Sequence, residues 1–424
     1  MRRAVPFRAH APASRDGRSL PPADHAVPQL HDLLHRGAMA SVLDRSLRSG
    51  AEVEDLRVTL VDYQPGSGAT VAYDVAIAGA RHVAVATAGH ALCPEAARTD
   101  ARRAIARALG RHSPVARPLT YDVGLGALVQ WYPLDLAMPV LARPVPELLR
   151  LVARAGIVVG SDGATTSTLV YRPGQRAVIR TGDVVLKAYA EDVAFRAGVS
   201  GLRIAAGLGL GLGAGPRLHG ALPELRLTVQ SALDGTAVPR ARAREVAPIA
   251  GAMLGVLHDA RMPGLTVAAS DRTLASAARA ARFTAAVAPG LARRTLDLLA
   301  RLEEHAPDPD ELVPSHGDFN ISQLLDVEGA IAVLDFDEAC LAPRALDVTS
   351  YAANLVSGRP GDLARANAAL ASLLDGYGAP PQALHWYLAA ALLRRAPSPF
   401  RLHKRNWLHR TEAIVAAAEA VLGR

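Results

Sequence analysis

Two aspartates in the C-terminal part of the chain are placed where phosphate chemistry would need them. Asp318 lies in the run Ser315–Leu325, and Asp335 directly follows the apolar run Ala332–Leu334. Each carboxylate therefore stands beside a short apolar segment that is typical of a strand. In phosphoryl transfer, one aspartate positions and deprotonates an attacking hydroxyl, while another holds the magnesium that bridges the nucleotide phosphates. The pattern predicts this chemistry if the rest of the chain supplies a nucleotide site.

Lysine is rare in this chain, and its placement is informative. Of the 47 lysines and arginines, only Lys187 and Lys404 are lysines. Lys187 lies in the apolar, β-branched run Asp183–Tyr189, which predicts a strand. A lysine ammonium is a compact point charge, so it suits the α and β phosphates of a nucleotide better than the broader arginine fork. A surface lysine on an edge strand is the alternative, and the downstream aspartates Asp318 and Asp335 favour the phosphate contact.

The segment before Lys187 predicts a β-hairpin. Residues Thr168–Arg180 contain two strand-like runs separated by Pro173 and Gly174, the residue types of a tight turn. Such a turn could lie over the phosphates of a nucleotide held by the lysine strand.

The segment Leu225–Gly235 predicts a strand that runs into an irregular hinge. Backbone groups of Gln230 and Ala232 in this hinge could meet a purine edge. A helix is predicted next, from about 244 to 260, because apolar residues recur there at helical period. His258 near its end is expected to pack rather than to act in catalysis.

These motifs in this order resemble the aminoglycoside phosphotransferase and choline kinase superfamily, which has the protein-kinase-like fold. The resemblance covers about 165–350, and its most specific part is an ordered set of acidic and polar positions: His316-Gly317-Asp318, Gln323, Leu334-Asp335-Phe336-Asp337 and Ala345-Leu346-Asp347.

The resemblance implies a role for each matching residue. Asp318 would be the catalytic base or hydroxyl-orienting group, and Lys187 would contact the phosphates. Gln323 and Asp335 would be the magnesium ligands. Two further residues, His316 and Asp347, would brace the catalytic loop.

Three features depart from the family's pattern. Gln323 stands where most relatives have asparagine, although glutamine offers the same carbonyl oxygen on a longer arm. The helix expected after the lysine strand has no acidic residue over Val193–Ala206, and Glu191 or Asp192 could pair with Lys187 only if that helix starts early. There is also no Gly-x-Gly-x-x-Gly before the lysine.

The N-terminal part repeats features of the nucleotide-binding region. The Tyr-x-Pro-Gly of Tyr63–Gly66 recurs at Tyr171–Gly174, and Leu128–Asp135 resembles the hinge-like Thr228–Asp234. Two matches in the same order predict an internal repeat of the small lobe, with chance similarity of two hairpins as the alternative. The first copy has no lysine in Arg81–Thr87, so it would be a degenerate lobe or cap.

The expected fold is α+β: a bilobal protein-kinase-like fold, with a small β-rich lobe and a larger, mostly helical lobe, preceded by an α+β N-terminal domain. The predicted boundaries are a disordered leader over 1–28, the cap or degenerate small-lobe-like domain over 29–150, the nucleotide-binding small lobe over 151–238, and the catalytic and acceptor-binding helical lobe over 239–424.

The C-terminal helices are expected to wall the acceptor pocket, as the resemblance implies. A basic segment, Arg394–Arg405, lies among them. It could attract an anionic acceptor or nucleotide, but a solvated basic face is the prediction. The arginine-rich helices argue against a polycationic aminoglycoside as acceptor.

Composition limits the function classes. No apolar run is long enough to cross a bilayer, and the leader lacks the apolar core of a secretory signal. Cys93 and Cys340 form neither a disulfide framework nor a metal-ligand spacing, which fits a reducing cytoplasm. The net charge is +7, but the arginines are spread along the chain and aromatic residues that could stack on bases make up only 4% of it. Nucleic-acid binding is therefore not expected.

The predicted function is transfer of the γ-phosphoryl group of ATP, or of GTP, to a hydroxyl of a small molecule such as a sugar, an aminoglycoside or an amino alcohol, with Mg²⁺. A pseudokinase or nucleotide-binding scaffold is the alternative. A protein kinase is disfavoured because only nine residues separate Asp337 from Asp347, which leaves little room for an activation loop. The oligomeric state and the identity of the acceptor stay open.

Overall fold

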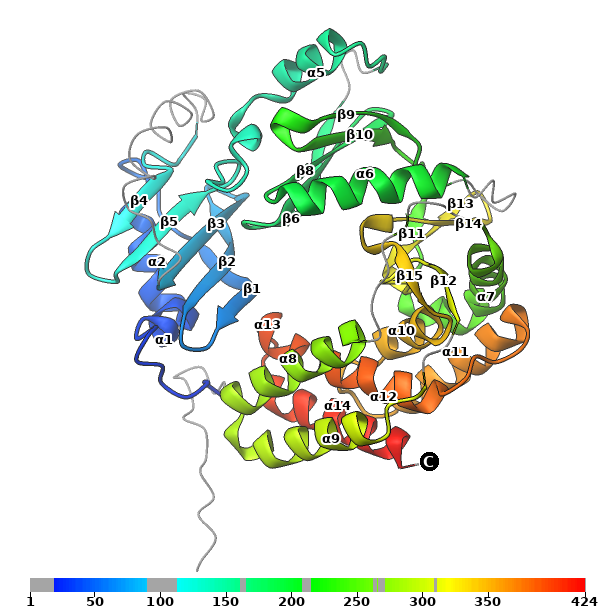
Figure 1. Cartoon of the computed structure of the whole chain (residues 1–424). Helices are drawn as coiled ribbons and strands as arrows, with labels where there is room; N and C mark the ends of the chain where they lie inside the picture. The colour runs from blue at the N-terminus through cyan, green and yellow to red at the C-terminus, as the bar shows by residue number, and fades with distance from the viewer. Residues whose placement is uncertain are drawn as a thin grey trace, which may run out of the picture.

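The structure, a computed structural model (Figure 1), describes 19–89, 113–160, 165–207, 215–261, 265, 271–308 and 311–423. It has the predicted α+β class: two antiparallel five-stranded sheets precede a mostly helical region. The second sheet and the helical region form the two lobes of a protein-kinase-like fold.

The first sheet is built from long strands whose buried residues alternate with exposed ones in β1, as expected when one face covers a core. Its order is β1-β2-β3-β5-β4, and helices α1 (Leu30–Leu34) and α2 (Arg36–Asp44) precede it. The strands are β1 Asp55–Gln64, β2 Gly68–Ile77, β3 Ala80–Gly89, β4 Leu119–Asp122 and β5 Ala127–Trp131.

The second sheet has the same strand order as the first, β6-β7-β8-β10-β9. Its helix α6 (Asp192–Gly207) follows the third strand and contacts β8, β9 and β10. Helix α5 (Val145–Arg154) lies in the connection between the sheets. The strands are β6 Thr166–Arg172, β7 Arg176–Thr181, β8 Val184–Tyr189, β9 Leu218–Leu222 and β10 Leu227–Ser231.

The helical region confirms the helices predicted after Asp347 and the one predicted near 244–260. Its longer helices are α7 Ala243–Asp259, α8 Asp271–Val287, α9 Ala292–Glu304, α10 Ala345–Leu355, α11 Asp362–Tyr377, α12 Leu384–Arg395 and α14 Trp407–Leu422, with the single turn α13 Ser398–Arg401. Short strands lie at its junction with the second sheet: β11 Thr236–Ala237, β12 Leu312–Ser315, β13 Leu324–Val327, β14 Ala330–Val333 and β15 Cys340–Pro343.

Two glycines let α7 and α11 pack closely. A Cβ on Gly251 would lie 2.0 Å from the carbonyl oxygen of Leu373, and one on Gly376 would lie 1.9 Å from that of Pro248. Any side chain at either position would force the helices apart, so this close pair fixes the core below the catalytic loop.

The first sheet contacts both of the other parts, as Figure 1 shows. The ring of Tyr63 at the end of β1 packs against Phe283 of α8 and Phe400 of α13, with centroids 6.2 and 6.3 Å apart. Tyr132, just after β5, packs on Tyr171 of β6 at 4.7 Å. The N-terminal domain therefore bridges the helical lobe and the hairpin of the small lobe.

Part of the leader predicted over 1–28, residues 19–28, is ordered in the structure. Residues 19–28 pack onto the protein: Val27 is fully buried, and the Trp407 indole N–H donates to the carbonyl of Ser19 at 2.6 Å. These contacts anchor a segment whose polar and proline-rich composition predicted disorder. Residues 1–18 lie outside the described residues, as does Cys93. None of the helices described here is long and apolar enough to span a membrane.

Candidate active site

Asp335 and Asp337, called the acidic pair from here on, directly follow the β13–β14 hairpin. Asp335 adopts a left-handed backbone conformation, with φ of +64°, and a single 3₁₀ turn over Phe336–Glu338 follows it. Aspartate tolerates this conformation better than most residues. The turn brings Asp337 to the same side as Asp335, so two carboxylates face one ammonium group.

Lys187 supplies that ammonium group. It lies in the middle of β8, between β7 and β10, and only 6% of the residue is exposed. Its Nζ is 2.6 Å from Oδ1 of Asp335 and 2.6 Å from Oδ2 of Asp337. The structure thus brings together two residues that the sequence analysis placed in one site, and it shows that Lys187 is not an exposed edge lysine.

Helix α6 does not supply the acidic partner that most relatives place there. Asp192 is at its start, but its carboxylate pairs with Arg196 at 2.7 Å on the surface. Among the described residues, the ion pairs of Lys187 are with the acidic pair itself.

Arg176 is a site residue that the sequence analysis missed. It begins β7, directly after the Pro-Gly turn, and its fork donates to Asp335 at 2.8 and 3.2 Å and to Asp337 at 3.2 Å. The Tyr189 hydroxyl adds a bond to Asp337 at 3.2 Å. In the sequence, nothing distinguishes Arg176 from many other arginines except its place next to the turn.

The charges around the acidic pair separate its two pKa values. Burial alone would raise the pKa of Asp335, but Lys187 and Arg176 together hold that pKa well below its ordinary value. Burial raises the pKa of Asp337 against the opposing effect of Lys187, and the neighbouring charge of Asp335 raises it further. Asp335 is therefore the more readily ionised member of the pair.

Asp347 holds the catalytic loop by its backbone. Its fully buried carboxylate accepts hydrogen bonds from the N–H groups of His316 and Gly317, at 2.6 and 2.9 Å. His316 in turn contacts the carbonyl of Leu334 through Nε2 at 2.8 Å, which joins the loop to the strand that ends at Asp335. The glycine is required, because its φ is +82° and a Cβ there would lie 2.1 Å from the carbonyl oxygen of Glu338.

His258 packs under the same carboxylate. Its Nε2 lies 3.5 Å from Asp347, and its Nδ1 lies 2.8 Å from the hydroxyl of Tyr377. Burial would raise the pKa of Asp347, but the bond from His258 and the charges of His258 and His316 lower it. The carboxylate therefore stays ionised inside the core.

Asp318 projects from this loop into a cavity between the helices. Burial raises the pKa of Asp318, and the nearby charge of Arg394 opposes that rise. The cavity has a volume of about 550 Å³. This is the size of a small-molecule site.

Gln323 and Asp335 lie at the open end of the β13–β14 hairpin, just before its first strand and just after its second. The Leu334 N–H donates to the Gln323 carbonyl at 2.8 Å. The backbone of Gln323 therefore lies beside the residue that precedes Asp335. The described residues contain no cluster of three or more His, Cys, Asp or Glu side chains that could hold a metal. Carboxylate and amide oxygens from Asp335 and Gln323 nevertheless fit magnesium, which is usually bound by one or two protein oxygens together with substrate phosphates.

The hinge is less open than the sequence indicates. Gln230 pairs with Val185 of β8, but the N–H of Ala232 donates to the carbonyl of Asp183 at 2.7 Å. That bond satisfies the donor which was expected to meet a purine edge. In this structure Ala232 would have to release Asp183 before it could serve a nucleotide.

A buried aspartate, which the sequence analysis missed, anchors the Pro-Gly turn between β6 and β7. Asp135, after β5, accepts bonds from the Tyr171 hydroxyl and the Gly174 N–H, both at 2.9 Å. Asp24 makes the same two bonds to Tyr63 and Gly66 in the first sheet, at 2.6 and 2.8 Å. Each aspartate also accepts from the N–H two residues later, Ala137 or Ala26, at 2.9 Å.

The basic segment is only partly a solvated face. Arg394, Arg395 and Arg401 line the cavity beside Asp318, which corrects the prediction for these residues. They reach the cavity because α12 ends there and α13 turns the chain back along its wall.

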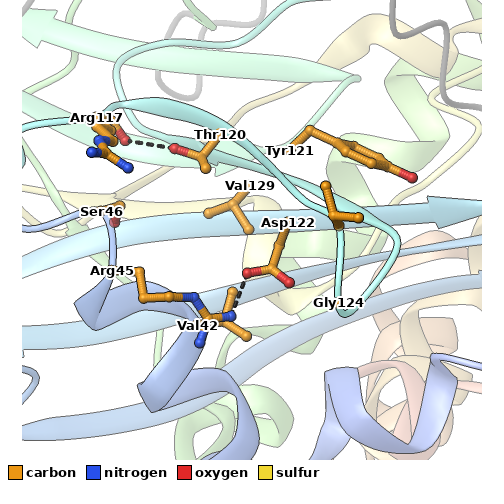
Figure 2. A pocket seen from close by; sticks show the side chains of 10 residues that line it. Val42, Arg45, Ser46, Arg117, Thr120, Tyr121, Asp122, Gly124 and Val129 are labelled. Atoms are coloured by element: carbon orange, nitrogen blue, oxygen red, sulfur yellow. Dashed lines mark hydrogen bonds and ion pairs between the residues drawn. The ribbon is translucent and has the colours of Figure 1, made fainter.

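A second cavity, of about 470 Å³, lies wholly in the N-terminal domain. Figure 2 shows it with the Arg45–Asp122 ion pair at its edge. None of the predicted site residues lines it. It is lined by Val42, Arg45, Ser46, Arg117, Thr120, Tyr121, Asp122, Val123, Gly124 and Val129.

Comparisons with known proteins show the family of the chain. The fold and the ordered acidic positions define a phosphotransferase of the protein-kinase-like class. The sequence model described as the phosphotransferase enzyme family matches residues 179–402, more than half of the chain. The chain belongs to that family and is a phosphotransferase that acts on hydroxyl groups.

The chain is also similar to solved structures of phosphotransferases and kinases. A choline/ethanolamine kinase family protein from Mesorhizobium loti is 16% identical, with a TM-score of 0.47 over 65% of this chain and 95% of that one. A macrolide 2'-phosphotransferase from Brachybacterium faecium is 23% identical, with a TM-score of 0.42 over 64% and 97%. No curated protein matched the sequence.

Proposed function

We propose that this phosphotransferase moves the γ-phosphoryl group of ATP, or of GTP, to a hydroxyl of a small molecule. The observation that carries the proposal is the contact of Lys187 with both Asp335 and Asp337 at 2.6 Å, opposite the loop that presents Asp318. A buried lysine held at an acidic pair beside a cavity has the charges that a magnesium nucleotide needs.

In the proposed complex, the cations and carboxylates exchange partners. Lys187 and Arg176 would leave the acidic pair and contact the phosphates. Asp335 and Gln323 would hold Mg²⁺, which supplies neutralisation of the phosphate charge when it is bound. Gln230 would lie beside the purine, and Ala232 would join it after releasing Asp183.

In the proposed transfer step, one bond forms, one bond breaks and one proton moves to Asp318. The acceptor hydroxyl oxygen forms a bond to the γ phosphorus as the bond from that phosphorus to the β–γ bridging oxygen breaks. The bond's electron pair leaves with the nucleoside diphosphate, and the hydroxyl proton passes to the carboxylate of Asp318. His316 and Asp347 act only by positioning the loop, which is where much of the rate comes from in this chemistry.

We also propose that the N-terminal domain is a degenerate copy of the small lobe that acts as a cap. Three observations support it: the identical strand order, the matching Tyr-x-Pro-Gly turns and the paired aspartate anchors. If Leu128 is aligned with Thr228, the residue that pairs with it, Thr87, takes the place of Lys187. A threonine cannot offer the charge that a phosphate needs, so this copy would not bind a nucleotide.

The proposed domain boundaries follow the sheets and the helical region. A cap over 29–150 includes the first sheet, a small lobe over 151–238 includes the second, and a catalytic lobe over 239–424 holds the helices.

The test is transfer of labelled phosphate from γ-labelled ATP, with Mg²⁺, to separate panels of sugars, aminoglycosides and amino alcohols. A labelled product that needs both magnesium and Asp318 supports the proposal. Label that reaches only water, at the same rate in the Asp318→Asn variant, contradicts it.

A pseudokinase or nucleotide-binding scaffold is the second candidate, and one observation favours it. Arg176 and Lys187 both pair with the carboxylates of Asp335 and Asp337, so two cations already neutralise the side chains that an enzyme would use for its metal. Magnesium-independent ATP binding in the wild type, together with the absence of a labelled acceptor, would support this candidate over the enzyme.

A further inference from the structure

The cavity beside Asp318 has an unusual charge for a site that binds hydroxyl compounds. Its wall comes from the catalytic loop, the β15 segment and helices α8, α12 and α13. It is lined by Arg172, Thr273, Ser276, Arg279, Gly317, Asp318, Glu338, Cys340, Ala342, Pro343, Leu346, Tyr387, Ala390, Ala391, Arg394, Arg395, Ser398 and Arg401. Five of these residues are arginines and two are carboxylates, so the lining is strongly cationic.

Some arginines elsewhere in the described residues pair with carboxylates, whereas those that line this cavity do not. Within the described ranges, none of the five makes an ion pair with a carboxylate. Arg279 donates only to the Ser276 hydroxyl at 2.9 Å, and the guanidinium of Arg401 lies 5.0 Å from the ring centroid of Phe283. By contrast, Arg176 and Arg242 each contact two carboxylates.

Arg395 is the clearest member of the group. Its Nε is buried and has no hydrogen-bond partner among the described residues. Burial, together with the charges of Arg240 and Arg394, lowers the pKa of Arg395 to about 10. An unpaired cation in such a place costs stability, so proteins normally keep it only where an anion binds.

Arg172 belongs to the nucleotide side of the cavity. It ends β6 next to the Pro-Gly turn, so it reaches the cavity from the sheet that also carries Lys187. We assign it to the transferred phosphoryl group. That leaves the arginines of α8, α12 and α13 without a role in nucleotide binding.

We infer that the acceptor is an anionic hydroxyl compound, one that carries a carboxylate or a phosphate group. Arg394 and Arg395, at the end of α12, would bind the anion while the hydroxyl faces Asp318. The inference rests on the proposed function for the identity of the reaction, but the anion site itself does not depend on catalysis. A guanidinium fork matches the two oxygens of a carboxylate or phosphate.

The same charges exclude polycations. An aminoglycoside would bring several ammonium groups next to four acceptor-side arginines, and like charges across a contact are strongly unfavourable. A neutral sugar would fit by size but would leave Arg395 unpaired.

The first experiment sorts acceptors by charge. A metabolite extract is separated by ion exchange into anionic, neutral and cationic fractions, and each is incubated with the full-length protein, Mg²⁺ and γ-labelled ATP. We expect the labelled product in the anionic fraction. A product found only in the neutral or the cationic fraction would overturn the inference and leave the proposed function standing.

The second experiment measures the anion site without catalysis. Inorganic sulfate is titrated into the protein saturated with magnesium and a non-hydrolysable ATP analogue, so that the nucleotide phosphate sites are filled. Arg395→Met should weaken sulfate binding by about 10-fold or more, because a charge-assisted hydrogen bond is lost. Arg301→Met, on an exposed arginine of α9, is the matched control and should bind as the wild type does.

Folding is checked separately. The melting temperature of Arg395→Met should equal or exceed that of the wild type, because the variant removes an unpaired buried charge. Arg394→Met gives a second variant if Arg395→Met is not folded. Equal sulfate affinity in the wild type and the folded variants would overturn the anion site, even if phosphoryl transfer is observed. Loss of sulfate binding in the variants with no transfer in any fraction would keep the anion site and reject the proposed function.

Discussion

The Nζ of Lys187 lies 2.6 Å from Oδ1 of Asp335, across the junction of the two lobes. The lysine comes from the second sheet and the aspartate from the hairpin of the helical lobe. Since α6 offers no acidic partner, this contact and the one to Asp337 orient the lysine. The residue that would contact the nucleotide therefore rests on the residues that would hold the metal.

Lys187 should be necessary for nucleotide binding. Lys187→Met removes the ammonium group from a buried strand position, and we expect the ATP dissociation constant to rise by about 10-fold, equivalent to ~1.4 kcal/mol. Lys187→Arg should not restore it, because the broad guanidinium fork does not replace a compact ammonium group held 2.6 Å from both Asp335 and Asp337. Calorimetric titration with ATP and Mg²⁺ checks this, and wild-type affinity in Lys187→Met would remove the residue from the site.

Arg176 should compete with magnesium for Asp335. In Arg176→Gln the carboxylate loses one cation, so we expect the Mg²⁺ concentration needed for half-maximal activity to fall by about 3-fold to 10-fold. The measurement is a magnesium titration at saturating ATP. A higher magnesium requirement in the variant would contradict a competition between Arg176 and Mg²⁺ for Asp335.

Asp135 and Asp24 make the same bonds, and they form a matched pair of variants. Each substitution to asparagine leaves a buried tyrosine hydroxyl and a glycine N–H without a carboxylate, so each should lower the free energy of unfolding by about 1–3 kcal/mol. Only Asp135→Asn should also raise the KM for ATP, because only its turn lies over the proposed nucleotide site.

Steady-state kinetics and denaturant unfolding of both variants separate these effects. An equal rise in KM in Asp24→Asn would mean that the first turn also serves the nucleotide. An unchanged KM in Asp135→Asn would remove the turn from the phosphate site.

Asp347 should give the protein a pH-dependent stability. Its pKa in the folded state is lower than the ordinary value of about 3.9, so its contribution is fully present above that value and is lost as the pH falls through the folded-state pKa. At neutral pH, Asp347→Asn should be less stable by about 3 kcal/mol, because an ionised partner of the loop N–H groups and of His258 is lost. Urea unfolding at neutral and acidic pH should show this gap narrowing in acid; a constant gap would contradict the assignment.

The sequence predicted the parts of the site that depend on local order. Asp318, Asp335 and Lys187 are candidates because each lies in a short motif with a defined place along the chain, and the structure places Lys187 against Asp335. The hairpin before Lys187 follows from its Pro-Gly turn. The strand orders of the two sheets also agree with the repeat that was inferred from two short matches.

The missed residues depend on contacts across long sequence separations. Arg176 is 159 residues from Asp335, and no periodicity or motif connects two such positions. Asp135 left a signal that could have been used: Asp-x-Ala-x-Pro occurs at Asp24–Pro28 and again at Asp135–Pro139, each before a Tyr-x-Pro-Gly. The cavity arginines looked like a solvated face because sequence alone does not show which helix ends turn inward.

Asp318 is the test of the central claim. Burial raises its pKa, so the base should lose its ionised form, and the enzyme its activity, at a pH above the ordinary range of an aspartate. Asp318→Asn keeps the shape of the side chain and removes the base.

The most direct measurement compares the wild type and Asp318→Asn at saturating ATP and Mg²⁺, following transfer of the labelled γ phosphate to a hydroxyl compound, with ATP affinity measured in parallel. The account predicts a labelled product from the wild type, a rate about 10²-fold to 10⁴-fold lower in the variant, and ATP affinities that agree within about threefold. Equal transfer rates, or loss of ATP binding in Asp318→Asn, would contradict it.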